Sequence, residues 1–354
     1  MLRIAMIGCG HIGTVHSYAL RQLGTAGLVD ARVTATYDPD PDRAARLAAH
    51  HGATAFDTIG AALDEADVAW ISTWTAGHAH AVELAVERGL AVFCEKPLAP
   101  TFAECERVAT LLSGVPHQVG LVLRHAPVFA LGADIVRSGR YGRVLVTNFR
   151  DDQYFPIQGM YASTWRADAA KAGGGTLIEH SIHDVDLLAW ILGEPSSVSA
   201  ATAERFGYRG IEDTAVVRLG YPDGSQAVLE SIWHQVLTRG SSRRLEIFCE
   251  GAYCWTEDDY LGPWVVETSD GVSQLEGLLP EWAHRLDVPE VHAKSVVQYA
   301  EPAKAFLDAV AEGAGKGGFP TVHEALAAHR VVEAAYRSAA EGGRPVDPVT
   351  LDAL

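Results

Sequence analysis

The chain has 354 residues, of which 48% are hydrophobic, and a formal net charge of −17. Length and apolar content suffice for two domains that each have a core. The acidity excludes nucleic acid as a partner, because phosphate backbones are bound by basic side chains. It also disfavours binding to an anionic membrane surface.

The chain shows no sign of export or membrane insertion. No apolar run reaches the roughly 18 to 20 residues that span a bilayer. Residues 1–9 are expected to form a strand and not a signal peptide, because a glycine motif follows at once. The five cysteines have no close repeat and predict no disulfide framework. The sequence therefore predicts a cytoplasmic protein.

A strand followed by a glycine-rich turn opens the chain. Residues 2–7 are an apolar run of strand length, and a helical stretch extends to about Gly24. In G-x-G-x-x-G, the first glycine permits a tight turn, the second lets the backbone approach a pyrophosphate, and the third lets the helix pack closely. The helix N-terminus attracts phosphate. The predicted dinucleotide loop comprises Gly8, Gly10, His11, Ile12 and Gly13.

Asp38 decides the expected form of the dinucleotide. It follows residues 32–37, which alternate as a strand does. A carboxylate at the tip of the second strand accepts hydrogen bonds from ribose hydroxyls and repels a 2′-phosphate. The expected cofactor is therefore NAD, while Arg43 keeps NADP as the less favoured alternative. Asp38 could instead be a plain helix cap before Pro39.

Strands and helices continue to alternate. Residues 68–73, 91–94 and 117–123 have the pattern of buried strands, and residues 78–88 and 101–112 that of helices. This order predicts a parallel, doubly wound sheet. Ligands bind at the carboxyl ends of the strands in such sheets.

Lys96 stands at one of these strand ends, within Glu95-Lys96-Pro97. We expect Glu95 and Lys96 to border the cofactor, together with Thr73 and Trp74 after the preceding strand. Only an X-Pro bond adopts the cis form at low cost. We therefore expect a cis Lys96-Pro97 bond that directs the lysine toward the nicotinamide.

A third motif combines a carboxylate and an imidazole. The stretch 173–193 reads G-G-G-x-L-x-E-x-x-x-H-D-x-D-x-x-x-W-x-x-G. Glu179 and His183 are four residues apart, which places both on one face of a helix. Asp186 is expected on the same face. The alternative is a buried core histidine and a capping glutamate. No metal is expected, because an HExxH-type spacing is absent.

Together the three motifs resemble the Gfo/Idh/MocA oxidoreductase family, named for glucose–fructose oxidoreductase, inositol dehydrogenase and a rhizopine catabolism protein. The resemblance implies an α/β fold. A Rossmann domain with a doubly wound parallel sheet, residues 1–124, would precede an α/β domain for substrate binding and oligomerisation, residues 125–354. That second domain would contain a large, open, mostly antiparallel sheet.

The resemblance also implies site roles. Lys96 would be the active-site lysine, His183 the catalytic histidine, and Glu179 an acidic residue that is commonly aspartate. We expect all three to be catalytic residues. The extra methylene of Glu179 is one departure from the family. Trp74-Thr75 is another, because many members have Pro-Asn there.

Oxidation of a secondary alcohol requires a hydride acceptor, a base and a cation that stabilises the developing alkoxide. NAD supplies the acceptor. His183 has the proton affinity of a base near neutrality, and Lys96 can supply the cation or act as the base itself. The sequence thus predicts an NAD(P)-dependent dehydrogenase that transfers a hydride between a nicotinamide and a secondary hydroxyl of a sugar, polyol or cyclitol.

Two other functions remain open. One is a sugar-modifying enzyme that retains NAD, of the glycosidase or epimerase type. The other is a non-catalytic, NAD-binding sugar sensor, although the joint presence of Lys96, Glu179 and His183 argues against it.

Further side chains are candidates for substrate contact beside Lys96 and His183. Aromatic faces stack on sugar rings, and arginine binds hydroxyls or carboxylates. Ordinary core packing is the alternative for the aromatic residues. The candidates are Arg124, Tyr154, Trp165 and Arg166.

The second half has the pattern of an antiparallel sheet followed by helices. Tyr221-Pro222-Asp223-Gly224 predicts a hairpin turn. The predicted strands are 143–150, 197–205, 213–220, 225–235, 243–249 and 252–256, and the predicted helices are 303–312 and 322–340.

These helices can cover only one face of so large a sheet. An exposed apolar face is normally buried against a second subunit. We therefore expect a homodimer or homotetramer formed through the sheet. The alternating residues that suggest this face are Ala215, Val217, Leu219, Val228, Glu230 and Ile232.

Overall fold

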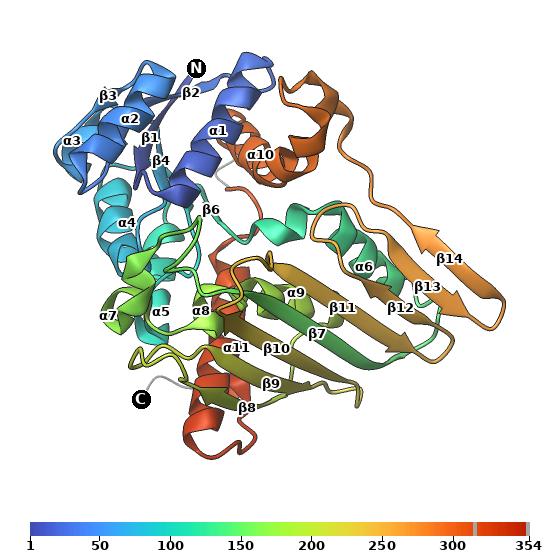
Figure 1. Ribbon diagram of the computed structural model, residues 1–354. Coiled ribbons are helices and arrows are strands. Elements are labelled where there is room, and N and C mark those ends of the chain that lie inside the picture. The colour runs from blue at the N-terminus through green and yellow to red at the C-terminus, as the bar shows by residue number, and fades with distance from the viewer. Residues whose placement is uncertain (314–316, 352–354) are drawn as a thin grey trace. The chain divides into compact units, whose positions relative to one another are not determined.

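The computed structural model describes residues 1–313 and 317–351 (Figure 1). The chain forms two compact units. Unit 1 consists of Met1–Val122 and Leu279–Leu326, and unit 2 of Leu123–Leu278 and the chain from Ala327 onward. Each unit contains one β-sheet.

The sheet of unit 1 is parallel throughout, as predicted, with the order β3-β2-β1-β4-β5-β6. Ile7, Ile71 and Cys94 are paired across β1, β4 and β5, so these strands end together at one edge. The strands are β1 (Leu2–Ile7), β2 (Ala31–Tyr37), β3 (Thr54–Ala55), β4 (Val68–Ile71), β5 (Ala91–Cys94) and β6 (His117–Val119). Residues 117–123 are therefore a strand only as far as Val119, and a 3-10 turn covers Val122–His125.

Helices cover both faces of this sheet. On one face, α1, α2 and α10 bury their apolar stripes against β-strand residues such as Ile4 and Trp70. On the other, α3, α4 and α5 pack against residues such as Ile71 and Val92. The helices are α1 (His11–Thr25), α2 (Pro41–His51), α3 (Ile59–Asp64), α4 (His78–Glu87), α5 (Phe102–Leu112) and α10 (Glu290–Ala311).

Helix α10 joins unit 1 although it lies late in the chain. The sequence placed residues 125–354 in the second domain, whereas the compact unit 1 includes Leu279–Leu326. The physical reason is the burial of apolar side chains. Ala300, Ala303 and Phe306 of α10 are fully buried in the core that also contains Trp70. The predicted helix 303–312 is the second half of α10, which begins at Glu290 and contains Pro302.

The sheet of unit 2 has eight strands in the order β14-β13-β12-β11-β7-β10-β9-β8. All neighbouring pairs are antiparallel except β7 with β10. The strands are β7 (Val144–Tyr154), β8 (Ser197–Ala203), β9 (Thr214–Gly220), β10 (Gln226–His234), β11 (Ser242–Cys249), β12 (Tyr253–Thr256), β13 (Trp264–Thr268) and β14 (Gly271–Leu275). The predicted strands include neither β13 nor β14. Strand β14 is mostly exposed and lacks the apolar alternation by which a strand is recognised.

The predicted turn between β9 and β10 is confirmed. The Tyr221 N–H donates to the Ser225 carbonyl at 3.1 Å, and Gly224 has a φ of +89°. This is the left-handed conformation that glycine tolerates.

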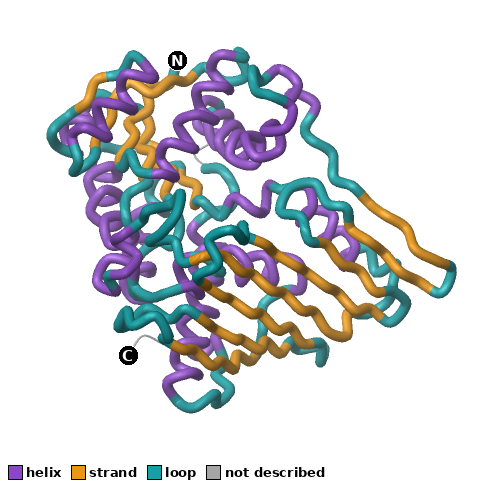
Figure 2. Tube along the Cα trace, in the orientation of Figure 1, coloured by secondary structure: helices purple, strands orange, loops and turns teal. Residues whose placement is uncertain are grey.

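The helices of unit 2 lie on one face of the sheet (Figure 2). Ala215, Val217 and Leu219 of β9 are buried against them. Their proposed part in a subunit interface is therefore wrong, because they point to the core. Residues Val228 to Ile232 alternate, so that Val228, Glu230 and Ile232 lie on the other face and are at least partly exposed. The helices are α6 (Pro127–Arg137), α7 (Ala169–Ala172), α8 (Thr176–Glu179), α9 (Ile182–Leu192) and, from Ala327 onward, α11 (Val322–Ala340).

Candidate active site

The glycine loop of unit 1 is packed so closely that two of its glycines cannot be replaced without movement. A Cβ on Gly8 would lie 2.5 Å from the Ser72 carbonyl oxygen, and one on Gly13 would lie 2.2 Å from the Gly8 oxygen. Gly10 differs, because a Cβ there would meet nothing within 4 Å. Gly10 is also the N-cap of α1, and no side chain caps this helix. The loop thus offers the open, dipolar helix end that binds phosphate.

Asp38 is tied to the glycine loop. Its Oδ2 accepts a hydrogen bond from the Cys9 N–H at 2.7 Å, and its Oδ1 accepts from the Asp40 N–H at 2.9 Å. The cap of α2 is Asp40, which accepts from the Asp42 N–H. The alternative reading of Asp38 as a plain helix cap is therefore wrong. Arg43 is paired with Asp40 at 3.2 Å.

Lys96 lies on the same edge of the sheet as the glycine loop. It follows Glu95, directly after β5, and its side chain is partly buried. The Lys96-Pro97 peptide bond is cis, as predicted. Thr73 and Trp74 follow β4 on the same edge, and the Thr73 hydroxyl donates to the Trp74 carbonyl at 3.1 Å.

The edge therefore presents the predicted cofactor residues in a defined order. Asp38 follows β2, the glycine loop follows β1, Thr73 follows β4 and Lys96 follows β5. Three strand spacings separate β2 from β5, or roughly 14 Å at about 4.8 Å each. An extended dinucleotide fits this order, with its adenosine ribose toward Asp38 and its pyrophosphate at the open helix end.

In unit 2, Glu179 and His183 do not share a helix. Helix α8 ends at Glu179 and α9 begins at Ile182. The expectation that their spacing places them on one helical face is wrong. The break occurs at Ser181, whose hydroxyl lies within hydrogen-bonding distance of Asp151 at 3.0 Å and Ser231 at 2.7 Å.

Three predicted residues of unit 2, Glu179, Arg166 and Trp165, do lie together. The Glu179 carboxylate is 2% exposed and accepts a hydrogen bond from Arg166 Nε at 3.1 Å. The Arg166 guanidinium lies 4.2 Å from the centre of the Trp165 ring. The aromatic face, the cation and the acid thus form one group.

The other two candidates are held by neighbours in the same unit. Arg124 donates two hydrogen bonds to Asp186, at 2.8 and 2.7 Å, and both side chains are buried. The Tyr154 ring packs against Tyr161 at 5.4 Å. Asp186 thus serves as the partner of Arg124, while substrate contact by Arg124 or Tyr154 stays a prediction.

A buried charge cluster fixes the segment between α8 and α9. Arg243 of β11 donates to Asp184 at 2.7 Å, to Asp151 at 3.1 Å and to Asp259 at 3.0 Å. His180 lies 3.0 Å from Asp151. Burial, together with the negative charge of Asp151, raises the pKa of Asp184 to about 8. Sequence reasoning missed Asp151 and Arg243, because they lie on strands far from the motif.

A metal site and a membrane-spanning helix are both absent from the described part of the chain. Residues 1–313 and 317–351 contain no group of three or more His, Cys, Asp or Glu side chains placed to hold a metal ion. No described helix is long and apolar enough to cross a membrane.

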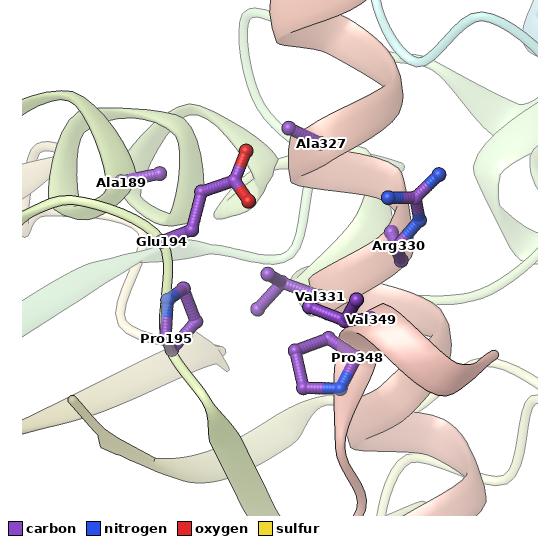
Figure 3. A pocket seen from close by; sticks show the side chains of 8 residues that line it. All are labelled: Ala189, Glu194, Pro195, Ala327, Arg330, Val331, Pro348 and Val349. Carbon is purple, nitrogen blue, oxygen red and sulfur yellow. The ribbon is translucent and has the colours of Figure 1, made fainter. Parts of the chain in front are cut away.

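A pocket lies at the C-terminal end of α9, with Glu194 and Arg330 on its walls (Figure 3). Its lining residue Ala189 lies about 9 Å along α9 from His183, at about 1.5 Å per residue. None of the candidate residues lines the pocket. The lining residues are Ala189, Glu194, Pro195, Ala327, Arg330, Val331, Pro348 and Val349.

Two family models match the chain. Residues 2–121 match the oxidoreductase family with an NAD-binding Rossmann fold, and residues 130–253 match the GFO/IDH/MocA C-terminal domain. The chain belongs to the Gfo/Idh/MocA oxidoreductase family. The predicted α/β fold and the NAD-binding Rossmann domain are thereby confirmed.

Full-length relatives agree with this assignment. Inositol 2-dehydrogenase of Rhizobium meliloti (strain 1021) is 29% identical over 96% of this chain and 97% of its own. Myo-inositol dehydrogenase Hyg17 of Streptomyces leeuwenhoekii is 28% identical over 98% of this chain and 100% of its own. A solved structure from Sinorhizobium meliloti 1021, described as a candidate myo-inositol dehydrogenase, superposes with a TM-score of 0.76 at 25% identity and covers 98% of this chain and 99% of its own.

The charge cluster predicts a pH-dependent stability. The folded protein keeps a proton on Asp184 that the unfolded chain loses above about pH 4. The stabilisation by this proton is complete below about pH 4 and is lost as the pH rises through about 8. Between about pH 5 and 8, the free energy of unfolding should fall by up to ~1.4 kcal/mol per pH unit, and the fall should level off above about pH 8. Urea denaturation measures this slope.

Asp184→Asn should flatten the slope, because the amide keeps a donor toward Asp151 and an oxygen toward Arg243. Asp223→Asn, in the exposed turn before β10, is the matched control and should leave the slope unchanged. Equal slopes for wild type and Asp184→Asn would contradict the prediction.

Proposed function

We propose that this enzyme is an NAD-dependent dehydrogenase that oxidises a secondary hydroxyl of a cyclitol, sugar or polyol. The observation that carries the proposal is the position of Lys96. It stands on the sheet edge that carries the glycine loop and Asp38, two strands from β1. A cation at this place would face the reacting end of a dinucleotide that extends from Asp38 across β1.

Lys96 and His183 are the proposed catalytic residues. Bound NAD supplies the hydride acceptor. The substrate C–H electron pair leaves as hydride, the hydroxyl proton passes to a protein base, and the carbon–oxygen double bond forms. His183 suits the role of base, and the Lys96 ammonium suits stabilisation of the developing negative charge. The reverse assignment, with Lys96 as the base, transfers the same hydride and the same proton and gives the same products.

Trp165 and Arg166 are proposed to bind the substrate, beside Glu179 as the third proposed catalytic residue. Glu179 uses one oxygen to hold Arg166, and Arg166 lies over the Trp165 ring. Aromatic rings and guanidinium groups bind the alternating apolar and hydroxyl surfaces of a sugar or cyclitol. Relatives named as inositol dehydrogenases, among them those of Rhizobium meliloti and Streptomyces leeuwenhoekii, make a cyclitol the first substrate to test.

The test is a screen of NAD reduction with purified enzyme over inositol stereoisomers, monosaccharides, linear polyols and sugar acids, followed by absorbance of NADH. We expect net NADH production with at least one cyclitol or sugar. Product formation without net NADH would instead indicate an enzyme that retains NAD. Ligand binding without any turnover would indicate a sensor.

Lys96→Ala and His183→Ala should each lower turnover at least ~100-fold, the usual scale for one acid–base or electrostatic group. NAD affinity should persist, because neither residue belongs to the phosphate loop. Lys171→Ala, at an exposed lysine paired with Asp168, is the control and should keep full turnover. Wild-type turnover in a well-folded Lys96→Ala or His183→Ala variant would refute that residue's role.

Asp38 should give NAD tighter binding than NADP. Asp38→Ala should erode the preference, and Asp38→Asn should erode it as well, because the amide removes the charge but keeps one oxygen for the backbone N–H groups. Titration calorimetry with both dinucleotides measures the ratio. Tighter NADP binding by the wild type would defeat the prediction.

Assembly into a homodimer or homotetramer remains part of the proposal, as does a cytoplasmic location. Phe248, Val146 and Val216 lie on the face of the sheet opposite the helices and are 38–49% exposed. Phe248→Glu should place a charge on this face and dissociate the assembly. Light scattering should give a multiple of 37.9 kDa for the wild type and one chain for the variant. A monomeric wild type would contradict the expectation.

A further inference from the structure

A buried imidazole connects the dinucleotide helix to the Glu95-Lys96 segment. His16 lies in the second turn of α1 and is fully buried. Its Nε2 is 2.6 Å from Glu95 Oε1. The other oxygen of Glu95 accepts the Lys96 backbone N–H at 3.1 Å. One carboxylate therefore joins α1 to the backbone of Lys96.

The direction of the proton in this contact follows from the charge of Glu95. Burial opposes its ionisation, but the hydrogen bond and charge of His16, with the nearby Lys96, lower the pKa of Glu95 below its usual value. An ionised carboxylate can only accept hydrogen bonds. His16 Nε2 therefore carries the hydrogen and donates it to Glu95.

Aromatic rings leave the imidazole little freedom. The rings of Trp70, Phe93 and Tyr299 lie 5.4, 5.1 and 5.3 Å from that of His16. Glu95 is equally confined. A Cβ on Gly120 would lie 2.6 Å from its Oε1, so that any side chain there would displace the carboxylate from this position.

Stability alone does not account for this arrangement. A buried pair of polar or charged groups is often no more stable than apolar side chains of similar size, because both groups lose their hydration. For packing among three aromatic rings, a phenylalanine ring at position 16 would serve as well as an imidazole. What an apolar ring could not do is hold the Glu95 carboxylate in one orientation.

The segment is held from a second side as well. His78, at the start of α4, lies with Nδ1 2.8 Å from the Pro97 carbonyl and Nε2 3.2 Å from the Thr73 carbonyl. Lys96 thus lies between two anchored neighbours, Glu95 and Pro97. Only the first anchor leads back to the helix whose N-terminus is expected to hold the dinucleotide.

We propose that His16 is a positioning residue for Lys96: it fixes the Glu95 carboxylate, which fixes the Lys96 backbone relative to α1. The inference rests on the proposed function, in which Lys96 takes part in the reaction. It assigns to His16 no contact with substrate or cofactor.

His16→Phe keeps a ring in the aromatic cluster and removes the donor. It should lower kcat on the order of 10- to 100-fold, because small displacements of a catalytic group have effects of this size. The affinity for NAD should be retained. His16→Gln, which restores an N–H donor, should recover most of the lost turnover. Steady-state kinetics and calorimetry measure both quantities.

Glu95→Gln tests the same link and serves if His16→Phe does not fold. The amide has a single oxygen, which cannot accept from both His16 and the Lys96 N–H in the observed geometry, so kcat should fall. The double variant should be no slower than the slower single variant, because both changes break one connection. Phe306→Leu is the control: it loosens the same apolar core and should leave kcat unchanged.

The turnover of Lys96→Ala, measured in parallel, separates the catalytic role of Lys96 from the positioning role of His16. Wild-type turnover in Lys96→Ala would refute the role of Lys96 in the proposed function. An impaired Lys96→Ala together with wild-type kcat in folded His16→Phe or in Glu95→Gln would overturn only the positioning role. Multiplicative losses in the double variant, or failure of His16→Gln to recover activity, would also overturn it.

Discussion

The close contact between the first strand–helix turn and the fourth strand is the constraint on which unit 1 depends. Gly8 and Gly13 permit an approach in which a methyl group at either position would overlap a backbone oxygen. This approach brings the N-terminus of α1 to the sheet edge and leaves Gly10 open. It also brings His16 within reach of Glu95. The same packing thus leaves the helix end proposed to bind phosphate open and joins α1 to the segment that carries Lys96.

In unit 2, the segment that carries the candidate residues Glu179 and His183 is not one regular helix. Residues 176–192 form two helices with a break at His180 and Ser181. The break is stabilised by contacts of Ser181 and His180 with Asp151, whose charge is balanced by Arg243. Three carboxylates around one guanidinium leave excess negative charge, and burial then favours a proton on Asp184. The cluster holds the main chain on both sides of the break, and so fixes Glu179 and His183 separately.

In both units, buried polar groups contact a segment that carries proposed catalytic residues. In unit 1 an imidazole and a carboxylate hold Lys96, and in unit 2 a guanidinium and aspartates hold the residues between α8 and α9. Such groups lose hydration when they are buried, and they are retained where orientation matters more than the last increment of stability. This accounts for polar residues in cores that apolar side chains could fill.

The sequence by itself determined the parallel sheet, the glycine loop, the hairpin before β10 and the choice of Lys96, Glu179 and His183 as candidates. These features depend on local signals: strand-length apolar runs, glycines at fixed spacing and short motifs. Only the tertiary structure decided that Asp38 binds Cys9, that α10 belongs to unit 1, that Ala215, Val217 and Leu219 point to the core, and that Glu179 and His183 lie on different helices. Each of these rests on a contact between residues distant in the chain, and neither periodicity nor spacing specifies which distant partner a buried polar or apolar side chain will meet.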